Sequence, residues 1–343
     1  MSEKLPIRPG LHEVAKVANV SIATVSRAIN NPKGSVTPET RKRVMAAVEK
    51  LNYRPNMIAR SFRSQKTKTI GIIVSDITHP HVANLIAGAE SVLKKSGYIY
   101  ILSNAANSLE GEKIGVELFL QNRVDGILST GFAGPSTKDI FFPLIENNVP
   151  LVLIGSSLYN NKVPSVYVDH TRGGYLATEH LIKSGHKNIL YMSGYHPDSE
   201  PRLKGYRNAL KDADIPINDD LVIYGGNTPE DGYKSIIKFL NKNNCPTAIF
   251  CFDDTVALGA MRGIYEKGLK IPSDCSIIGF DNIPYCQFSC PKLTTIAQPA
   301  VQMGEQGAKL LLELLNGKDG ASNKRIVFQP NLVLRESTGK RED

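Results

Sequence analysis

Residues 11–30 read LHEVAKVANVSIATVSRAIN and predict two short helices separated by a tight turn. Apolar residues recur at helical spacing and give the first helix one buried face: Leu11, Val14, Ala15 and Ala18. Asn19 follows where the chain must turn, and asparagine tolerates the left-handed backbone conformation better than most residues. Ser21 then suits the N-cap of the second helix, because its hydroxyl can accept a hydrogen bond from a free amide of the first turn.

The second helix has an inward and an outward face. Val25, Ala28 and Ile29 are expected to pack inward, which leaves other residues pointing outward: Ile22, Ala23, Ser26, Arg27 and Asn30. This layout is typical of a helix-turn-helix, whose second helix enters the DNA major groove by its N-terminal end. An ordinary helical hairpin is the alternative interpretation of the same pattern.

The distribution of charge favours DNA binding. Residues 1–68 contain 14 Lys and Arg against 4 Asp and Glu, a net charge of +10. The other 275 residues hold 27 basic and 29 acidic side chains, a net charge of −2, so the first fifth of the chain carries the whole excess. A basic segment attached to a near-neutral body is the electrostatic footprint of a nucleic-acid contact.

A resemblance to a known family rests on two longer runs, EVAKVANVSIATVSRAIN and VTPETRKRVMAAVEKLNYRPNMIARSFRS. These motifs resemble the head of the LacI/GalR family of bacterial transcription regulators, and later segments match too, so the resemblance covers about residues 10–338. The helix pattern and the resemblance together predict a set of DNA-binding residues: Ser21, Ile22, Ala23, Thr24, Ser26, Arg27, Asn30, Asn56, Ala59 and Phe62. Of these, Ile22, Ala23 and Arg27 are expected to face base edges. Thr24, Ser26 and Asn30 are expected to lie nearer phosphates.

The segment before the core is expected to divide into three parts. Residues 1–9 are interpreted as a disordered arm, residues 10–55 as a three-helix DNA-binding head, and residues 56–68 as a hinge helix and linker. In the family the matching hinge helix orders only on operator DNA and wedges a leucine into the minor groove. This chain has Phe62 at that position, which is an accepted wedge residue. Packing of Phe62 on the core domain is the alternative.

From residue 69 onward, short apolar runs alternate with helical stretches. Strands are expected at 70–74, 98–102, 126–128, 151–154, 165–168, 188–192, 221–224, 248–252 and 276–280. This alternation predicts an α/β fold, with parallel sheets covered on both faces and divided between two doubly wound subdomains. The resemblance implies a periplasmic-binding-protein-like core at 69–338. Its lobe 1 would span about 69–164 and 297–327, and its lobe 2 about 165–294 and 329–338.

Polar residues that follow the strands are the candidates for binding an effector, because ligands of open α/β sheets lie beyond the carboxyl ends of the strands. They are Asp76, His81, Arg202, Asp253 and Asp281. In the family, the positions matching Arg202 and Asp281 contact effector hydroxyl groups, work for which guanidinium and carboxylate are suited. Asp254 is an equal candidate for a helix N-cap, and Asp169 is expected to cap a helix at 175–182.

Two local departures bear on the identity of the effector. His81-Val82 replaces an aromatic pair that is common in the family, which puts ring stacking on the ligand from that loop in doubt. The stretch IGFDNIPYCQFSCPKLTTIAQP most resembles the cytidine-responsive branch of the family. It points to a nucleoside or pentose effector without distinguishing these from a hexose.

Several classes of protein are excluded by what the sequence lacks. No apolar run approaches the roughly 18 residues of a membrane span, and the N-terminus lacks the apolar core of a signal peptide, so a cytoplasmic location is expected. Five cysteines without a C-x-x-C pair predict reduced thiols, and the close pair His79 and His81 is too small for a metal site. Nucleophile-elbow, dinucleotide and phosphate-loop motifs are missing, so neither catalysis nor a cofactor is expected.

The sequence therefore predicts a homodimeric transcription regulator of the repressor type. It would bind a pseudopalindromic operator in double-stranded DNA and respond to a small hydroxylated metabolite, a sugar or nucleoside, between its lobes. A solute-binding protein is the second class, which would carry a signal peptide and no basic head. A regulator controlled mainly by a protein partner is the third. The terminal STGKRED has no leucine heptad, so a tetramerising tail is not expected.

Overall fold

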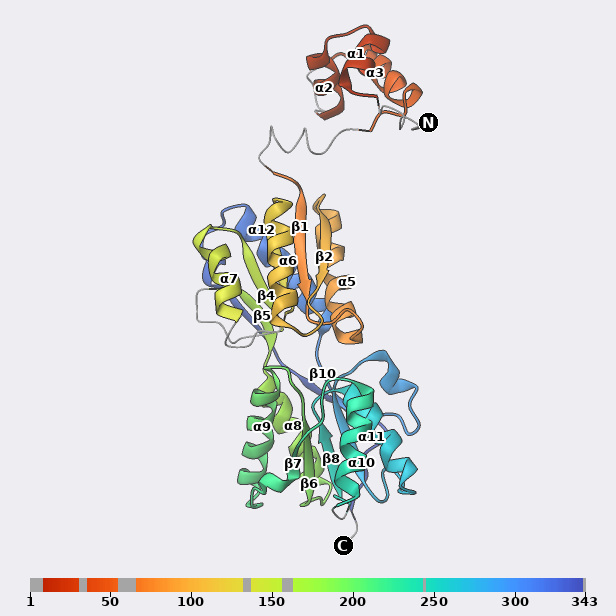
Figure 1. Ribbon diagram of the computed structural model, residues 1–343, viewed down its shortest axis with the longest axis vertical. Coiled ribbons are helices and arrows are strands. Elements are labelled where there is room, and N and C mark those ends of the chain that lie inside the picture. The colour runs from red at the N-terminus through yellow and green to blue at the C-terminus, as the bar shows by residue number, and fades with distance from the viewer. Residues whose placement is uncertain are drawn as a thin grey trace, which may run out of the picture. The chain divides into compact units, whose positions relative to one another are not determined.

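The computed structural model describes residues 9–30, 36–54, 66–131, 137–155, 163–242 and 245–341. The chain divides into two compact units, a head at Met1–Thr67 and a core at Lys68–Asp343 (Figure 1). Residues 1–8 of the arm expected at 1–9, and the hinge positions Asn56, Ala59 and Phe62, lie outside the described residues.

The described part of the head contains helices α1 (Leu11–Ala18), α2 (Ile22–Asn30) and α3 (Pro38–Lys50). Asn19 has a φ of 52° and turns the chain between α1 and α2, as predicted. Ser21 Oγ accepts a hydrogen bond from the Thr24 amide at 3.0 Å, which is the predicted cap of α2. Apolar side chains of all three helices form one core: Val14, Ala15, Ala18, Val25, Ala28, Val44, Ala47 and Tyr53.

The first lobe of the core is built on a six-stranded sheet in the order β11-β5-β4-β3-β1-β2, with all neighbours parallel. Its strands are β1 (Thr69–Val74), β2 (Ile99–Asn104), β3 (Gly126–Ser129), β4 (Leu151–Ile154), β5 (Ser165–Val168) and β11 (Arg325–Phe328). Helices α5 (Pro80–Lys95) and α12 (Ala300–Leu315) share one apolar cluster with the sheet. Helices α6 (Leu109–Gln121) and α7 (Thr137–Glu146) share another.

The second lobe has a six-stranded sheet in the order β12-β10-β9-β8-β6-β7, in which only β12 is antiparallel to its neighbour. Its strands are β6 (Ile189–Ser193), β7 (Val222–Tyr224), β8 (Ala248–Cys251), β9 (Ser276–Asp281), β10 (Thr294–Ala297) and β12 (Asn331–Val333). Helices α8 (His170–Lys183) and α9 (Ser199–Asp212) pack in one cluster. Helices α10 (Pro229–Leu240) and α11 (Asp254–Glu266) pack in the other. Short 3₁₀ turns lie at Asp219–Leu221, Pro284–Gln287 and Ala321–Asn323.

This architecture confirms the predicted fold class, and it corrects one strand. Residues 165–168 were expected to open lobe 2, but β5 pairs with β4 and β11 in the first sheet. The chain therefore passes to the second lobe after Val168 rather than near 164. Two short strands, β10 and β11, were not among the strands expected from the sequence.

Glycine pairs allow close helix crossings in both lobes. A Cβ atom on Gly88 of α5 would lie 2.0 Å from the Val301 carbonyl oxygen of α12, and one on Gly304 would lie 2.0 Å from the Leu85 carbonyl oxygen. Such backbone contact leaves no room for a side chain, so these glycines fix how α5 lies against α12.

None of the helices in the described residues is long and apolar enough to cross a membrane.

Candidate functional site

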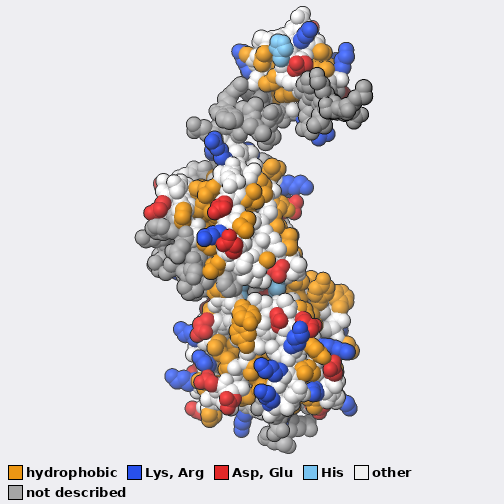
Figure 2. Space-filling view, in the orientation of Figure 1, with side chains coloured by type: hydrophobic (Ala, Val, Ile, Leu, Met, Phe, Trp, Pro, Cys, Tyr) orange, Lys and Arg blue, Asp and Glu red, His pale blue; other side chains and the backbone are white. Residues whose placement is uncertain are grey.

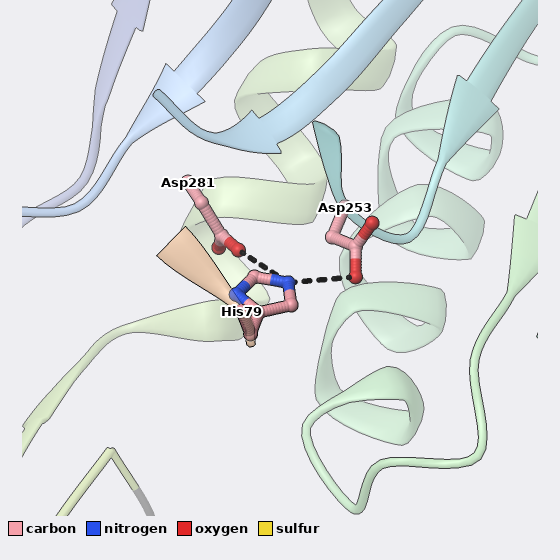
Figure 3. A group of neighbouring side chains, drawn as sticks. All are labelled: His79, Asp253 and Asp281. Carbon is pink, nitrogen blue, oxygen red and sulfur yellow. Dashed lines mark hydrogen bonds and ion pairs between the residues drawn. The ribbon is translucent and has the colours of Figure 1, made fainter. Parts of the chain in front are cut away.

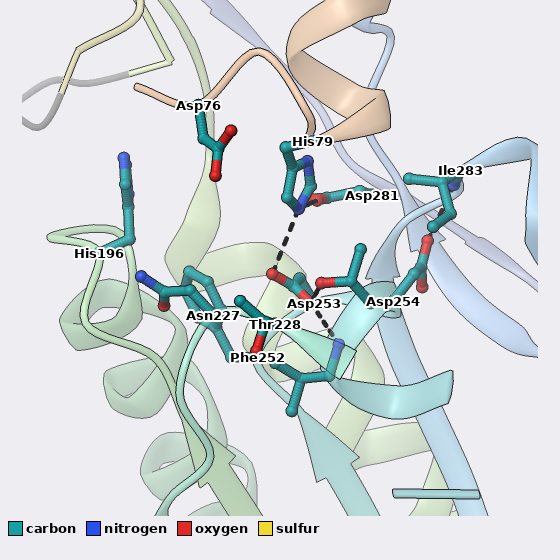
Figure 4. A network of polar contacts seen from close by, with 12 residues as sticks. Asp76, His79, His196, Asn227, Thr228, Phe252, Asp253, Asp254, Asp281 and Ile283 are labelled. Carbon is teal, nitrogen blue, oxygen red and sulfur yellow. Dashed lines mark hydrogen bonds and ion pairs between the residues drawn. The ribbon is translucent and has the colours of Figure 1, made fainter. Parts of the chain in front are cut away.

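A cavity of about 90 Å³ lies between the two lobes of the core (Figure 4). Its walls are loops at the carboxyl ends of strands from both sheets, which is where ligands of α/β sheets are expected. The structure brings all five predicted effector-binding residues to this cavity: Asp76, His81, Arg202, Asp253 and Asp281.

Eight further polar residues line the cavity and were not predicted from the sequence to bind the effector. They are Ser75, His79, Asn107, Thr130, His196, Asp198, Asn227 and Gln298. Most of them also follow strands, because Thr130 directly follows β3, Asn227 lies just after β7 and Gln298 directly follows β10. The same rule, applied to every strand rather than to a few, would have found them.

Arg202, on α9, is buried and its guanidinium group is held from several sides. Its Nη1 donates a hydrogen bond to the Phe252 carbonyl oxygen at 2.6 Å, and its Nε donates to His170 Nδ1 at 3.3 Å. The guanidinium carbon lies 4.5 Å from the ring centroid of Phe252 and 3.8 Å from that of Phe280. These contacts hold the guanidinium group over the faces of both rings, where a cation interacts favourably with an aromatic ring.

Asp281, the last residue of β9, faces the same space. Its Oδ1 accepts a hydrogen bond from Gln298 Nε2 at 2.6 Å and lies 3.7 Å from Arg202 Nη2. Its side chain is buried, so these two partners offset the cost of removing a carboxylate from water.

His79 reaches from the first lobe toward two carboxylates of the second (Figure 3). Its Nε2 lies 3.4 Å from Asp253 Oδ2 and 3.9 Å from Asp281 Oδ2. Burial alone lowers the pKa of His79, but the hydrogen bond and charge of Asp253, with the charges of Asp281 and Asp254, outweigh it and raise the pKa to about 9. The imidazole is therefore positively charged at neutral pH.

The neighbouring His81 has the opposite electrostatic setting. Burial lowers its pKa to about 4, since the attraction of Asp281 is too weak to offset the loss of water and the repulsion of nearby cations. The cavity thus presents one charged and one neutral imidazole from the same loop.

A third imidazole lies behind Arg202. His170 Nδ1 accepts a hydrogen bond from Arg202 Nε, and its Nε2 lies 3.2 Å from Asp198 Oδ2 and 3.1 Å from the Gly155 carbonyl oxygen. Burial raises the pKa of Asp198, but His170 and His196 more than reverse this effect and hold the pKa well below its usual range. Asp198 is therefore a carboxylate in the cavity wall.

The capping roles of two adjacent aspartates differ from the expectation. Asp253, rather than Asp254, is the N-cap of α11, and its Oδ1 accepts from the Val256 amide at 2.8 Å. Asp254 is fully buried and accepts from Thr295 Oγ1 at 2.5 Å and the Ile283 amide at 2.9 Å. Burial and the nearby Asp281 raise the pKa of Asp254 to about 8. Asp169 caps α8 as predicted, by accepting from the Arg172 amide at 2.8 Å.

The head presents the predicted face of α2 to solvent. Ser21, Ile22, Ala23 and Arg27 are exposed and Thr24 is half-buried. Ser26 was expected to point outward but is only 8% exposed, because it borders the inward stripe of Val25 and Ala28. Nothing is described of the Asn30 side chain. Figure 2 shows Lys and Arg side chains over the surface of the head.

This combination of head and core is also found in known proteins. A model of bacterial regulatory proteins, lacI family, matches residues 10–56, and a model of a periplasmic binding protein-like domain matches residues 178–338. The HTH-type transcriptional repressor PurR of Pasteurella multocida is 40% identical over 338 residues, which cover 96% of this chain and 99% of that protein. The chain belongs to the lacI family of bacterial regulatory proteins.

Solved structures of lacI-family regulators extend the comparison to three dimensions. The lac repressor dimer bound to operator and the anti-inducer ONPF is 28% identical, with a TM-score of 0.87 over 97% of this chain and 100% of that chain. A LacI family transcriptional regulator from Enterococcus faecium with bound ribose is 32% identical, with a TM-score of 0.71 over 80% of this chain and 100% of that chain.

Membership of the lacI family confirms the resemblance and identifies a transcription regulator rather than an enzyme. Regulators of this family bind operator DNA and small-molecule effectors. The cytidine-responsive branch stays a prediction, since none of the three relatives named above is described as a cytidine regulator.

Proposed function

We propose that this lacI-family regulator is a homodimeric repressor of transcription. It binds a pseudopalindromic operator through its two heads and responds to a small hydroxylated metabolite in the cavity between the lobes of its core. The observation that carries the effector part is the cavity between the lobes, in which Arg202 and Asp281 are both buried and held by neighbouring residues.

The head supports operator binding through both shape and charge. Arg27 extends from the exposed face of α2, where it can reach base edges in the major groove, beside the small side chain of Ala23. The net charge of +10 on residues 1–68 supplies the attraction to phosphates that does not depend on sequence.

The cavity is suited to a ligand the size of one sugar ring. Its volume of about 90 Å³ is several times the minimum of about 10–15 Å³ that a single water molecule needs. Carboxylates accept hydrogen bonds from hydroxyl groups and guanidinium donates to their oxygens, so the walls complement a polyol. The relative with bound ribose, a pentose, supports the same class of ligand. A nucleoside is the second candidate, favoured by the likeness of residues 278–299 to the cytidine-responsive branch.

The homodimer is supported by exposed apolar side chains of the core. Phe288 is 83% exposed, Tyr285 59% and Leu334 61% in the second lobe, while Ile99 of the first lobe is 61% exposed. Large exposed apolar groups commonly mark association surfaces. The lac repressor relative is a dimer on its operator.

Calorimetric titration of the full-length protein with pentoses, hexoses and nucleosides tests the proposal. One compound is expected to bind with one molecule per chain. Asp281→Asn is expected to weaken that binding about tenfold or more, because a charged hydrogen-bond acceptor is lost while the side-chain shape is kept. Asp219→Asn is the matched control, since this exposed carboxylate lies outside the cavity and pairs with Arg207 on the surface at 2.9 Å.

The same variants then separate the proposal from its rival. Asp281→Asn is expected to bind operator DNA like the unchanged protein while losing its response to the compound. If no sugar or nucleoside binds although the operator does, the regulator is controlled by a protein partner instead.

A further inference from the structure

The geometry around His79 points to a binding site for a divalent transition-metal ion, which we propose is held by His79 Nε2, Asp253 Oδ2 and Asp281 Oδ2 once the ion has displaced the proton that His79 Nε2 donates to Asp253. These three atoms lie within 4.8 Å of one another (Figure 3). The site lies in the cavity of the proposed effector and shares Asp253 and Asp281 with the residues predicted to bind it.

The separations between the donor atoms are close to those of a coordination sphere. Ions of this class bind imidazole nitrogen and carboxylate oxygen at about 2.0–2.2 Å, so adjacent ligand atoms lie about 3.0–3.5 Å apart. The measured distances from His79 Nε2 are 3.4 Å to Asp253 and 3.9 Å to Asp281. The first distance already fits such a sphere, and the second requires Asp281 and His79 to move closer together.

Each carboxylate keeps one oxygen for the ion and anchors the other. Asp253 Oδ1 accepts from the Val256 amide and from Thr255 Oγ1, at 2.8 and 2.7 Å. Asp281 Oδ1 accepts from Gln298 Nε2 at 2.6 Å. Hydrogen bonds of this kind orient the carboxylates of metal sites. The two Oδ2 atoms face His79, and both side chains are nearly inaccessible to water.

A second observation concerns two buried polar atoms in the lining of the same cavity. Gln298, 8% exposed, and Thr130, 7% exposed, both line the cavity. Within the described residues, Gln298 Oε1 and Thr130 Oγ1 have no hydrogen-bond partner. Buried polar atoms are rarely left without partners. Water molecules or hydroxyl groups on the open side of the ion would satisfy them.

The donor set selects the chemical class of the ion. One imidazole and two carboxylates suit Mn²⁺, Fe²⁺, Co²⁺ or Zn²⁺ better than Ca²⁺, which prefers six to eight oxygen ligands. His79 precedes α5 of the first lobe, whereas Asp253 and Asp281 belong to the second. A bound ion would therefore link the two lobes and favour the arrangement in which they approach each other.

Electron paramagnetic resonance of Mn²⁺ added to the chelator-treated full-length protein tests the site. One ion per chain is expected, with the ¹⁴N modulation that a coordinated imidazole gives. Removing a group that merely supports a metal ligand costs about 10- to 100-fold in affinity. His79→Gln and Asp253→Asn are therefore each expected to raise the Mn²⁺ dissociation constant by about 100-fold or more.

The variants are chosen so that misfolding cannot imitate loss of the ion. Asparagine caps helices as well as aspartate does, so Asp253→Asn keeps the start of α11. An unchanged circular dichroism spectrum and a single cooperative unfolding transition verify that both variants fold. His180→Gln, an imidazole outside the cavity that bonds Thr338 at 2.9 Å, is the control and should bind Mn²⁺ unchanged. Absence of Mn²⁺ binding, or equal binding by His79→Gln, overturns the proposal. The test uses no effector, so its failure leaves the proposed repressor function standing.

Discussion

At the scale of single residues, the backbone at the end of β9 directs a key side chain into the cavity. Asp281 has a φ of 111° and Asn282 a φ of 59°, which residues other than glycine seldom adopt. Such conformations cost about 1–3 kcal/mol each and persist only where the surroundings hold them. Gln298 holds Asp281 at 2.6 Å, and Arg335 donates to Asn282 Oδ1 at 2.7 Å. These hydrogen bonds offset the conformational cost at Asp281, the residue on which the proposed function depends most.

Replacement of Arg27 tests which residue reads the operator. Arg27→Ala is expected to cost about 1–3 kcal/mol on the specific site and much less on random DNA, because a contact with a base edge carries sequence information and a phosphate contact does not. Fluorescence anisotropy with both duplexes at the same salt concentration measures the two losses. Equal losses would assign Arg27 to the DNA backbone.

The charged state of His79 predicts how the stability of the core depends on pH. Its pKa is about 9 in the folded chain, compared with about 6.5 in the unfolded chain, so its contribution is complete below pH 6.5 and is lost as the pH rises through 9. The contribution amounts to at most about 3 kcal/mol. The pKa of Asp254 is also raised, to about 8 from the usual 3.8, so this group also lowers the stability of the core as the pH rises through that range.

In metal-free buffer, the melting temperature of the unchanged protein should therefore fall between pH 6.5 and 9.5 by more than that of His79→Gln. Differential scanning calorimetry at both values measures the difference. Parallel changes in the two proteins would show that His79 is not held in its charged form.

At the scale of helices and strands, local patterns were enough to predict most elements. The turn at Asn19 and the caps of α2 and α8 follow from the preferences of single residues, and each strand run lies within one or two residues of its predicted place. The sheet to which a strand belongs was not predictable in this way. The run at 165–168 is apolar and nearly buried, and it would suit either sheet, so only its pairing with β4 and β11 decides.

The crossing of α5 and α12 provides a test at this scale. Gly304→Ala is expected to destabilise the core by about 1–3 kcal/mol, because the added methyl group would meet the Leu85 carbonyl oxygen at 2.0 Å. This loss exceeds the gain of up to about 1 kcal/mol in helix propensity. Gln302→Ala, on the exposed side of the same helix, is the control and should change stability by less than about 0.5 kcal/mol. A Gly304→Ala protein as stable as the control would contradict the close packing of the two backbones.

At the scale of the whole molecule, the two units carry different parts of the proposed function. The head supplies positive charge and an exposed helix face, whereas the core supplies the cavity and the exposed apolar groups. A ligand can shift the protein between two states only by the difference between its affinities for them. Sequence patterns alone predict both proposed sites. They leave open which state the effector favours, since that depends on a free-energy difference between two conformations.

Reciprocity between the two sites gives the decisive measurement. If effector binding changes operator affinity by some factor, operator binding must change effector affinity by the same factor, which is typically about 5- to 150-fold for such couplings. Titration of the identified effector into the full-length protein, with and without saturating operator duplex, is therefore expected to give two different dissociation constants. A duplex of scrambled sequence at the same salt concentration should leave the effector affinity unchanged, because it offers charge without specific contacts. Equal dissociation constants with and without the operator would mean that the ligand of the cavity does not control DNA binding.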